Sequence, residues 1–350
     1  MKTGRQFKNS QQYLLKAVLF FAVLFLGNWA GFSQKKEIDS SNFVFYPEKI
    51  LIRTNLSTQN DAQTLEDKQG DNLNLETNNS YKLFLSVDYK FIGFSYGFYP
   101  QFIGGNKDEE EKGKSKFSEY NLRFFLGKWL QTADYSKIRG YYIENTQDFV
   151  PDWKPGIDPY IQLPDLKIVK YGMSTSYIFN PKFSLKSITS FTEWQKESAG
   201  SFIPTMIYDY KRISLETPIL NSKQSEYDIS LGAGYFYNFI IHKRFYIAPN
   251  VTVAVGAKFI NSKTDESGIQ KEEQDNYFLT SFNSGLKMGY NSDRILFGLS
   301  LNFNTSSYNE NKYQIVSNDG SFGLLYFGYR FDAPKFISKP VNKINEKLKL

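Results

Sequence analysis

Very few residues of this chain could support catalysis. Its 350 residues include one histidine, His242, and no cysteine. Sites that need two imidazoles or a thiolate are therefore excluded, among them the paired-histidine zinc motif and the cysteine nucleophile. A serine hydrolase would need His242 as its base, but this residue lies in a short basic stretch, 241–244, that we interpret as a turn between strands. We predict that the protein is not an enzyme.

Carboxylate clusters are the other chemically active feature. The runs 108–111 and 272–273 consist of Asp and Glu, have neighbouring lysines, and lie in segments that we interpret as loops. Acid–base catalysis needs two carboxyl groups held in different environments, which solvated loops do not provide. We therefore predict no catalytic residues, no cofactor and no metal centre; a weak calcium site is the alternative.

The first 33 residues have the organisation of a secretory signal peptide. Four basic residues and no acidic ones precede an apolar run at 17–26, and the small residues Gly31 and Ser33 follow it. A run of this length is too short to span about 30 Å of hydrocarbon. We predict export, with cleavage between Ser33 and Gln34. Without these four cations the formal net charge falls from +6 to +2, so nucleic acid is not an expected partner.

Most of the remaining chain alternates with a period of two between apolar residues and polar residues or glycine. The pattern is clearest at 227–239, 245–259 and 295–303. These segments exceed the usual soluble strand of about 5–6 residues and reach the roughly 9–11 residues of a tilted membrane strand. A strand with one apolar and one polar face predicts an outer-membrane barrel with lipid on its outside.

We predict an all-β fold, a closed antiparallel transmembrane barrel of twelve strands. The strands are expected at 49–57, 72–89, 91–100, 117–129, 138–146, 166–179, 182–195, 225–239, 245–260, 277–290, 294–306 and 321–331. Short connections alternate with long polar ones, which is typical of periplasmic turns and extracellular loops. A partly alternating stretch at 201–213 leaves fourteen strands as the alternative count.

The predicted organisation has four parts, and most of the mature chain resembles a known family. The parts are a signal peptide (1–33), a periplasmic segment (34–48), the barrel (49–331) and a basic periplasmic tail (332–350). The stretches 177–185 (Tyr-Ile-Phe-Asn-Pro-Lys-Phe-Ser-Leu) and 195–202, with the hairpin at 81–100, are similar to an uncharacterised family of Bacteroidota outer-membrane proteins that carry a domain of unknown function. The resemblance implies a barrel in the bacterial outer membrane and supplies no catalytic residue.

Ten ionisable residues are predicted to line the lumen of the barrel. They are Arg53, Lys82, Asp88, Arg123, Lys186, Asp228, Lys258, Lys287, Arg294 and Arg330, eight positive and two negative. A cation-lined lumen favours anionic solutes, so a narrow, porin-like pore is one prediction. Twelve strands lie between a filled barrel and an open channel. The other prediction is therefore a plugged structural or surface-recognition barrel, in which these side chains pair within the wall.

The long excursion at 147–165 is the candidate recognition loop. Four prolines stiffen it, and it carries Asp152, Trp153 and Tyr160, so little ordering entropy opposes binding. We predict either a constriction of the lumen or contact with a surface glycan or protein; a packed cap over the mouth is the alternative. Other expected partners are outer-membrane lipid, the outer-membrane assembly machinery and a small solute. The alternatives to a passive barrel are a secreted soluble β-rich binding protein and, less favoured, a membrane-embedded hydrolase.

Overall fold

The computed structural model describes residues 42–66, 72–104, 108–217, 220–310, 314–317 and 320–348. The predicted signal peptide, its cleavage pair Ser33 and Gln34, and the start of the periplasmic segment lie outside the described residues. Within these ranges, no helix has the length and apolar character needed to cross a membrane.

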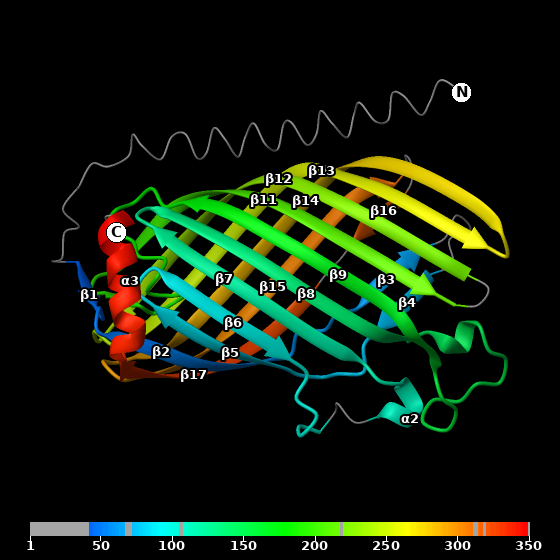
Figure 1. The fold of residues 1–350 in the computed structure, drawn as a ribbon, viewed down its shortest axis with the longest axis horizontal. Helices are drawn as coiled ribbons and strands as arrows, with labels where there is room; N and C mark the ends of the chain where they lie inside the picture. The colour runs from blue at the N-terminus through cyan, green and yellow to red at the C-terminus, as the bar shows by residue number, and fades with distance from the viewer. Residues whose placement is uncertain are drawn as a thin grey trace. The chain divides into compact units, whose positions relative to one another are not determined.

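Twelve antiparallel strands of the described chain close into a barrel (Figure 1). In order around the wall they are β2 (Lys49–Ser57), β5 (Lys82–Tyr89), β6 (Ile92–Phe98), β7 (Lys116–Leu126), β8 (Trp129–Ile143), β9 (Ile161–Tyr177), β11 (Ala199–Glu216), β12 (Leu220–Ile241), β13 (Phe245–Glu266), β14 (Ile269–Asn291), β15 (Ile295–Glu310) and β17 (Gly320–Asp332). Pairing of β17 with β2 and of β8 with β9 completes the ring. The predicted fold class and the count of twelve are confirmed.

Several smaller elements are not part of this ring. β1 (Phe43–Phe45) pairs with β10 (Glu193–Gln195), the hairpin of β3 (Gln63–Glu66) and β4 (Asn72–Glu76) continues from β8, and β16 (Gln314–Ser317) pairs with β15. The short helix α2 (Glu109–Lys112) and a 3-10 turn at Thr146–Asp148 lie in loops, and the tail contains helix α3 (Lys335–Leu348). Turns and strand ends thus divide the barrel into a terminal end, where β2 begins and β17 finishes, and a loop end.

Side chains alternate between the two faces of the wall. On β12 Leu231 is 65% exposed, whereas its neighbour Ser230 is buried; on β13 Val253 is 55% exposed. The register between β12 and β13 pairs outward residues with outward ones and inward residues with inward ones. Leu231 pairs with Val255, and Ser230 pairs with Gly256. Exposed large apolar residues therefore cover the outer face, where lipid is their expected solvent.

The predicted strand at 182–195 is wrong. Residues 178–198 connect β9 to β11 and are not part of the wall. The seventh strand of the ring is β11, which contains the partly alternating stretch 201–213. The segment is folded into turns by bonds such as the one that the Phe191 amide donates to the Lys186 carbonyl at 2.6 Å. The apolar residues of this segment are spaced like those of a strand, but in the structure they are buried in a packed core.

The structure also corrects the predicted start of one strand and divides another. β8 starts at Trp129 rather than 138, because the chain reverses at Gly127, whose φ of +62° suits glycine. The predicted strand at 72–89 is divided into β4 and β5. The turn around Asn78 explains this division, since its amide bonds the Ser115 hydroxyl rather than a neighbouring strand.

We expect Leu231→Arg to destabilise the folded barrel by about 2–4 kcal/mol, because the substitution places a charge among lipid chains. Urea titration of the protein in phosphatidylcholine vesicles, followed by heat-modifiable migration on gels, would measure this loss.

The matched control is Asn221→Arg on the same strand and face, beyond the apolar band, with an expected cost of about 0–1 kcal/mol. Equal, small effects of both changes would mean that water covers the face that carries Leu231.

Candidate functional site

Residues 178–198, here called the inner segment, pack against inward wall residues at the terminal end of the barrel. Phe183, Leu185 and Phe191 of this segment are buried, and Phe191 has no exposed surface. They pack in one cluster with Leu51 and Leu296 of the wall. The segment is covered in turn by the N-terminal strand β1, which pairs with its residues 193–195. Chain from two distant parts of the sequence thus fills this end of the barrel.

Three wall cations hold the backbone of the inner segment. Arg53 donates to the Thr189 carbonyl at 2.9 Å, Lys287 to the Ile188 carbonyl at 2.6 Å, and Arg330 to the Phe191 carbonyl at 2.8 Å. These cations come from β2, β14 and β17. Charged donors form stronger hydrogen bonds than neutral ones, so the carbonyls are bound to the wall at three points.

Phe191 is the centre of this contact. Its φ of +54° is in the left-handed region, which an aromatic residue rarely adopts. The guanidinium of Arg53 lies 5.1 Å from its ring centroid and the ammonium of Lys287 lies 5.9 Å from it. Rings of Tyr246 and Tyr326 contact the same ring at 6.1 and 5.7 Å. Packing and cation–π attraction therefore hold the strained turn in place.

Asp88 is the counter-charge of this layer. Its fully buried carboxylate lies 3.5 Å from Arg53 and 3.0 Å from Arg123. Gly93 on β6 allows this approach, since a Cβ there would overlap the Asp88 carboxylate. This layer holds Arg53, Arg123 and Lys287 near one carboxylate, and Arg53 and Lys287 also donate to carbonyls of the inner segment.

Nearer the loop end, the inner wall is polar and reached by solvent. Lys258 lies 2.7 Å from Glu226 and 2.9 Å from Asp228, and Lys170 lies 3.0 Å from Asp209. Both side chains are on the inward face, yet the Lys170 side chain is 47% exposed and the Asp209 side chain is 22% exposed. This polar, partly exposed region of the inward face is here called the vestibule.

The structure places eight of the ten predicted lumen residues on inward strand positions. These are Arg53, Lys82, Asp88, Arg123, Asp228, Lys258, Lys287 and Arg330. Lys186 lies instead on the inner segment, 3.6 Å from Glu193. Arg294 occupies an exposed turn, where it contacts the Tyr329 hydroxyl. Its assignment to the lumen is wrong, because the strand begins one residue later, at Ile295.

The described strands place further ionisable residues on inward positions, six of which matter for the charge balance. They are Glu119, Asp134, Lys170, Asp209, Lys211 and Glu226. Four of them are acidic. The net charge of the inner face is therefore closer to zero than the predicted set of eight cations and two carboxylates implies. Glu119 lies four residues before Arg123 and therefore on the same face of the strand. The alternation at 201–213 places Asp209 on the inward face, so the sequence contained a signal for both residues. Asp134 was hidden in a predicted turn.

The candidate recognition loop is packed on itself. Trp153 donates to the Pro159 carbonyl at 2.9 Å, and its ring contacts the tilted Tyr160 ring at a centroid distance of 4.7 Å. The Tyr160 ring in turn lies 4.9 Å from the ring of Tyr142 on β8. Burial raises the pKa of Tyr160, and the nearby Glu111 raises it further. Asp152 is exposed, with a φ of +61°. The two rings thus stabilise the loop, and Asp152 points its charge to solvent.

At the loop end, Lys82 serves as an anchor for the loop after β2. Its ammonium lies 2.6 Å from Asp61, and the Tyr99 hydroxyl donates to the same carboxylate at 2.7 Å. Lys82 also lies 4.5 Å from the centroid of the Phe117 ring. The buried cation is therefore paired rather than free to attract a solute.

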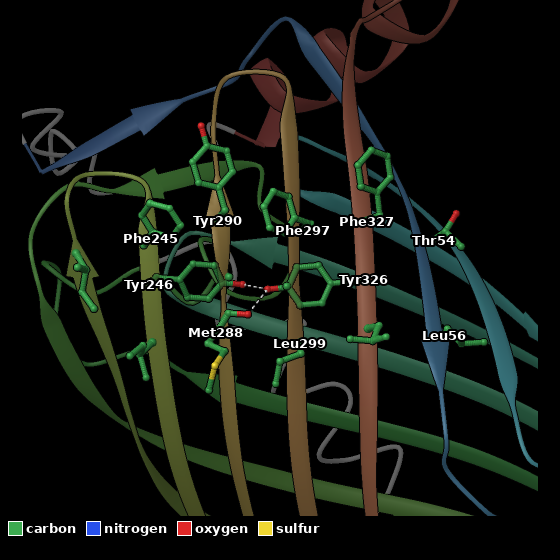
Figure 2. Close-up of a pocket in the computed structure, with 15 residues that line it drawn as sticks. Thr54, Leu56, Phe245, Tyr246, Met288, Tyr290, Phe297, Leu299, Tyr326 and Phe327 are labelled. Carbon is green, nitrogen blue, oxygen red and sulfur yellow. Dashed lines mark hydrogen bonds between the residues drawn. The ribbon is translucent and has the colours of Figure 1, made fainter.

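A groove of about 810 Å³ lies on the outer face of β13, β14, β15 and β17. Phe245, Phe297 and Phe327 form its rim, and Figure 2 shows Tyr246 and Tyr326 pointing toward one another, with their hydroxyls in contact. The rim residues share the lipid-facing side of the strands. The groove is therefore part of the lipid-facing surface rather than an entrance to the lumen. The described residues contain no cluster of three metal-ligating side chains.

A closed barrel with an apolar outside and a polar interior is the fold of bacterial outer-membrane proteins. The outer membrane protease OmpT from Escherichia coli is similar at 6% identity and a TM-score of 0.36, over 82% of this chain and 96% of that chain. The β domain of the Bordetella autotransporter BrkA is similar at 9% identity and a TM-score of 0.39, over 82% of this chain and 100% of that chain. LpxR from Salmonella typhimurium is similar at 12% identity and a TM-score of 0.34, over 80% of this chain and 100% of that chain.

The family model described as Domain of unknown function (DUF4421) matches residues 37–331, and the chain belongs to this family. No curated protein matches the sequence. The expected family with a domain of unknown function is thereby confirmed, as is its outer-membrane barrel fold, whereas the Bacteroidota origin stays a prediction.

We expect Asp88→Asn to lower the free energy of unfolding by about 3–5 kcal/mol, because Arg53 is then buried without its counter-charge. Urea unfolding of the protein in vesicles would measure the change.

The control is Asp332→Asn, which breaks the exposed pair with Lys49 and is expected to cost at most about 1 kcal/mol. If Asp88→Asn cost no more than this control, Asp88 would not be the counter-charge of the layer.

Proposed function

We propose that the protein is an exported outer-membrane barrel of passive role whose lumen is closed at rest by the inner segment. The three bonds from Arg53, Lys287 and Arg330 to the backbone of that segment carry the proposal. A connection held only by apolar packing could be displaced by small rearrangements, but here Lys287 would lose its carbonyl acceptor, and Arg53 and Arg330 would each lose one of theirs. The proposal places the terminal end in the periplasm and the loop end outside, as short turns and long loops favour.

The vestibule is then open to the outside and takes up small polar solutes. Paired charges such as Lys258 with Glu226 and Asp228 support a chamber of mixed charge rather than a strong anion trap. An anion preference would arise deeper, where Arg53, Arg123 and Lys287 surround Asp88. Displacement of the inner segment would expose this layer, so the proposed path conducts anions better than cations.

We expect the wild-type protein to show little conductance in planar bilayers. The double variant Lys287→Ala and Arg330→Ala should show frequent openings, because two of the three bonds to the inner segment are lost. The openings should favour chloride over potassium, measured as a reversal potential in a salt gradient.

Arg294→Ala is the matched control, since Arg294 is a cation of the terminal end that does not bind the inner segment. Folding of each variant is checked by heat-modifiable migration. A steady wild-type pore would contradict closure at rest. Folded double variants without openings would favour the plugged structural barrel.

A further inference from the structure

Six tyrosines form a row across adjacent strands on the outer face. They are Tyr96, Tyr120, Tyr135, Tyr171, Tyr210 and Tyr227, on β6, β7, β8, β9, β11 and β12, and each is the register partner of the next. Centroids of successive rings lie 4.9–6.2 Å apart. Tyrosine rings collect where the apolar band of a membrane protein meets the headgroups. The row therefore indicates the edge of the band on the loop side.

Basic residues lie directly beyond this row on the same face. Lys137 and Arg212 follow Tyr135 and Tyr210 by one outward position, and each pairs in register with Val169. In the next outward register row are Lys116, Arg139 and Lys167. Headgroups rather than lipid chains would surround these positions.

Most of these cations have no carboxylate partner. Arg139 is paired with Asp165 at 2.6 Å. Throughout the described ranges, no salt bridge is formed by Lys116, Lys137, Lys167 or Arg212. Arg212 is held by its own strand, since its guanidinium lies 5.6 Å from the centroid of the Tyr210 ring.

Three of the cations are arranged around one small residue. Val169 lies between Lys137 and Arg212 on neighbouring strands, each about 4.8 Å away across the sheet. Lys167 lies two residues before Val169 on the same strand, toward the loop end, and Tyr171 lies two residues after it. Long side chains from three directions can therefore converge over Val169 on a single anion, with a phenol below them.

The opposite wall lacks this arrangement. At the corresponding edge of its apolar band, the outward residues are Thr305 on β15, Ser321 on β17 and Thr58 after β2. They are polar and uncharged. The concentration of cations on β7–β11 is thus a property of one side of the barrel, not of the whole rim.

We propose that Lys137, Lys167 and Arg212 bind the phosphate headgroup of an anionic lipid in the leaflet at the loop end. Phosphate is the favoured ligand because arginine and lysine together bind its oxygens by charge and by hydrogen bonds. The acyl chains of that lipid lie below the tyrosine row, against the apolar band. This site is on the outer face and is independent of the inner segment and of conduction.

The test uses the full chain in neutral detergent with lipid A that carries both phosphates, and binding is measured by tryptophan fluorescence. Each basic residue near a charged lipid surface contributes roughly a factor of five. The triple variant Lys137→Gln, Lys167→Gln and Arg212→Gln should therefore bind on the order of 100-fold more weakly. Lipid A without phosphates should bind the wild type no better than the variant does.

The control variant is Lys223→Gln with Lys263→Gln, two outward cations already paired with Glu216 and Glu272, for which less than a threefold change is expected. All the changed residues are exposed or half-buried, and folding is checked by heat-modifiable migration. Equal affinity of the triple variant and the wild type would overturn the proposal. Displacement of the lipid by millimolar inorganic phosphate would also overturn it, since the site would then bind the free anion.

Discussion

In lipid, every backbone N–H and C=O group must find its partner within the protein, and this requirement governs the whole structure. The pairing of β17 with β2 and of β8 with β9 leaves no strand of the ring with an open edge. Closure also separates two environments. Residues such as Leu231 then face lipid, whereas Asp88 and Lys258 are placed in an interior that can solvate or pair them.

The closed wall explains why the inner segment can be held so firmly. Buried cations are costly unless acceptors surround them, and Arg53, Lys287 and Arg330 find these acceptors in carbonyls at 188, 189 and 191. The segment in turn needs donors, because its turns leave these carbonyls without backbone partners. Wall and segment thus satisfy each other, and the terminal end becomes a packed core inside a membrane barrel.

Regular alternation was predictive where strands are long. The predicted strands near β12, β13, β14 and β15 differ from the observed ones mainly in length at the loop end, since hairpins continue past the apolar band with polar residues on both faces. The prediction failed at 182–195, where Phe183, Leu185 and Phe191 repeat in a way that suits a strand but bury in a core. It also missed Asp134 and Asp209, because both strands were interpreted as connections.

The sequence by itself determined the class of fold, the strand number and most of the inward charges, because a period of two assigns each residue to one of two solvents. Only the tertiary structure decided that residues 178–198 pack inside the wall and which charges balance one another. The reason is physical: Arg330 and Phe191 are 139 positions apart, and no local pattern can express a contact that exists only after the wall has closed around the segment. The same holds for the cations around Val169, which come from three strands.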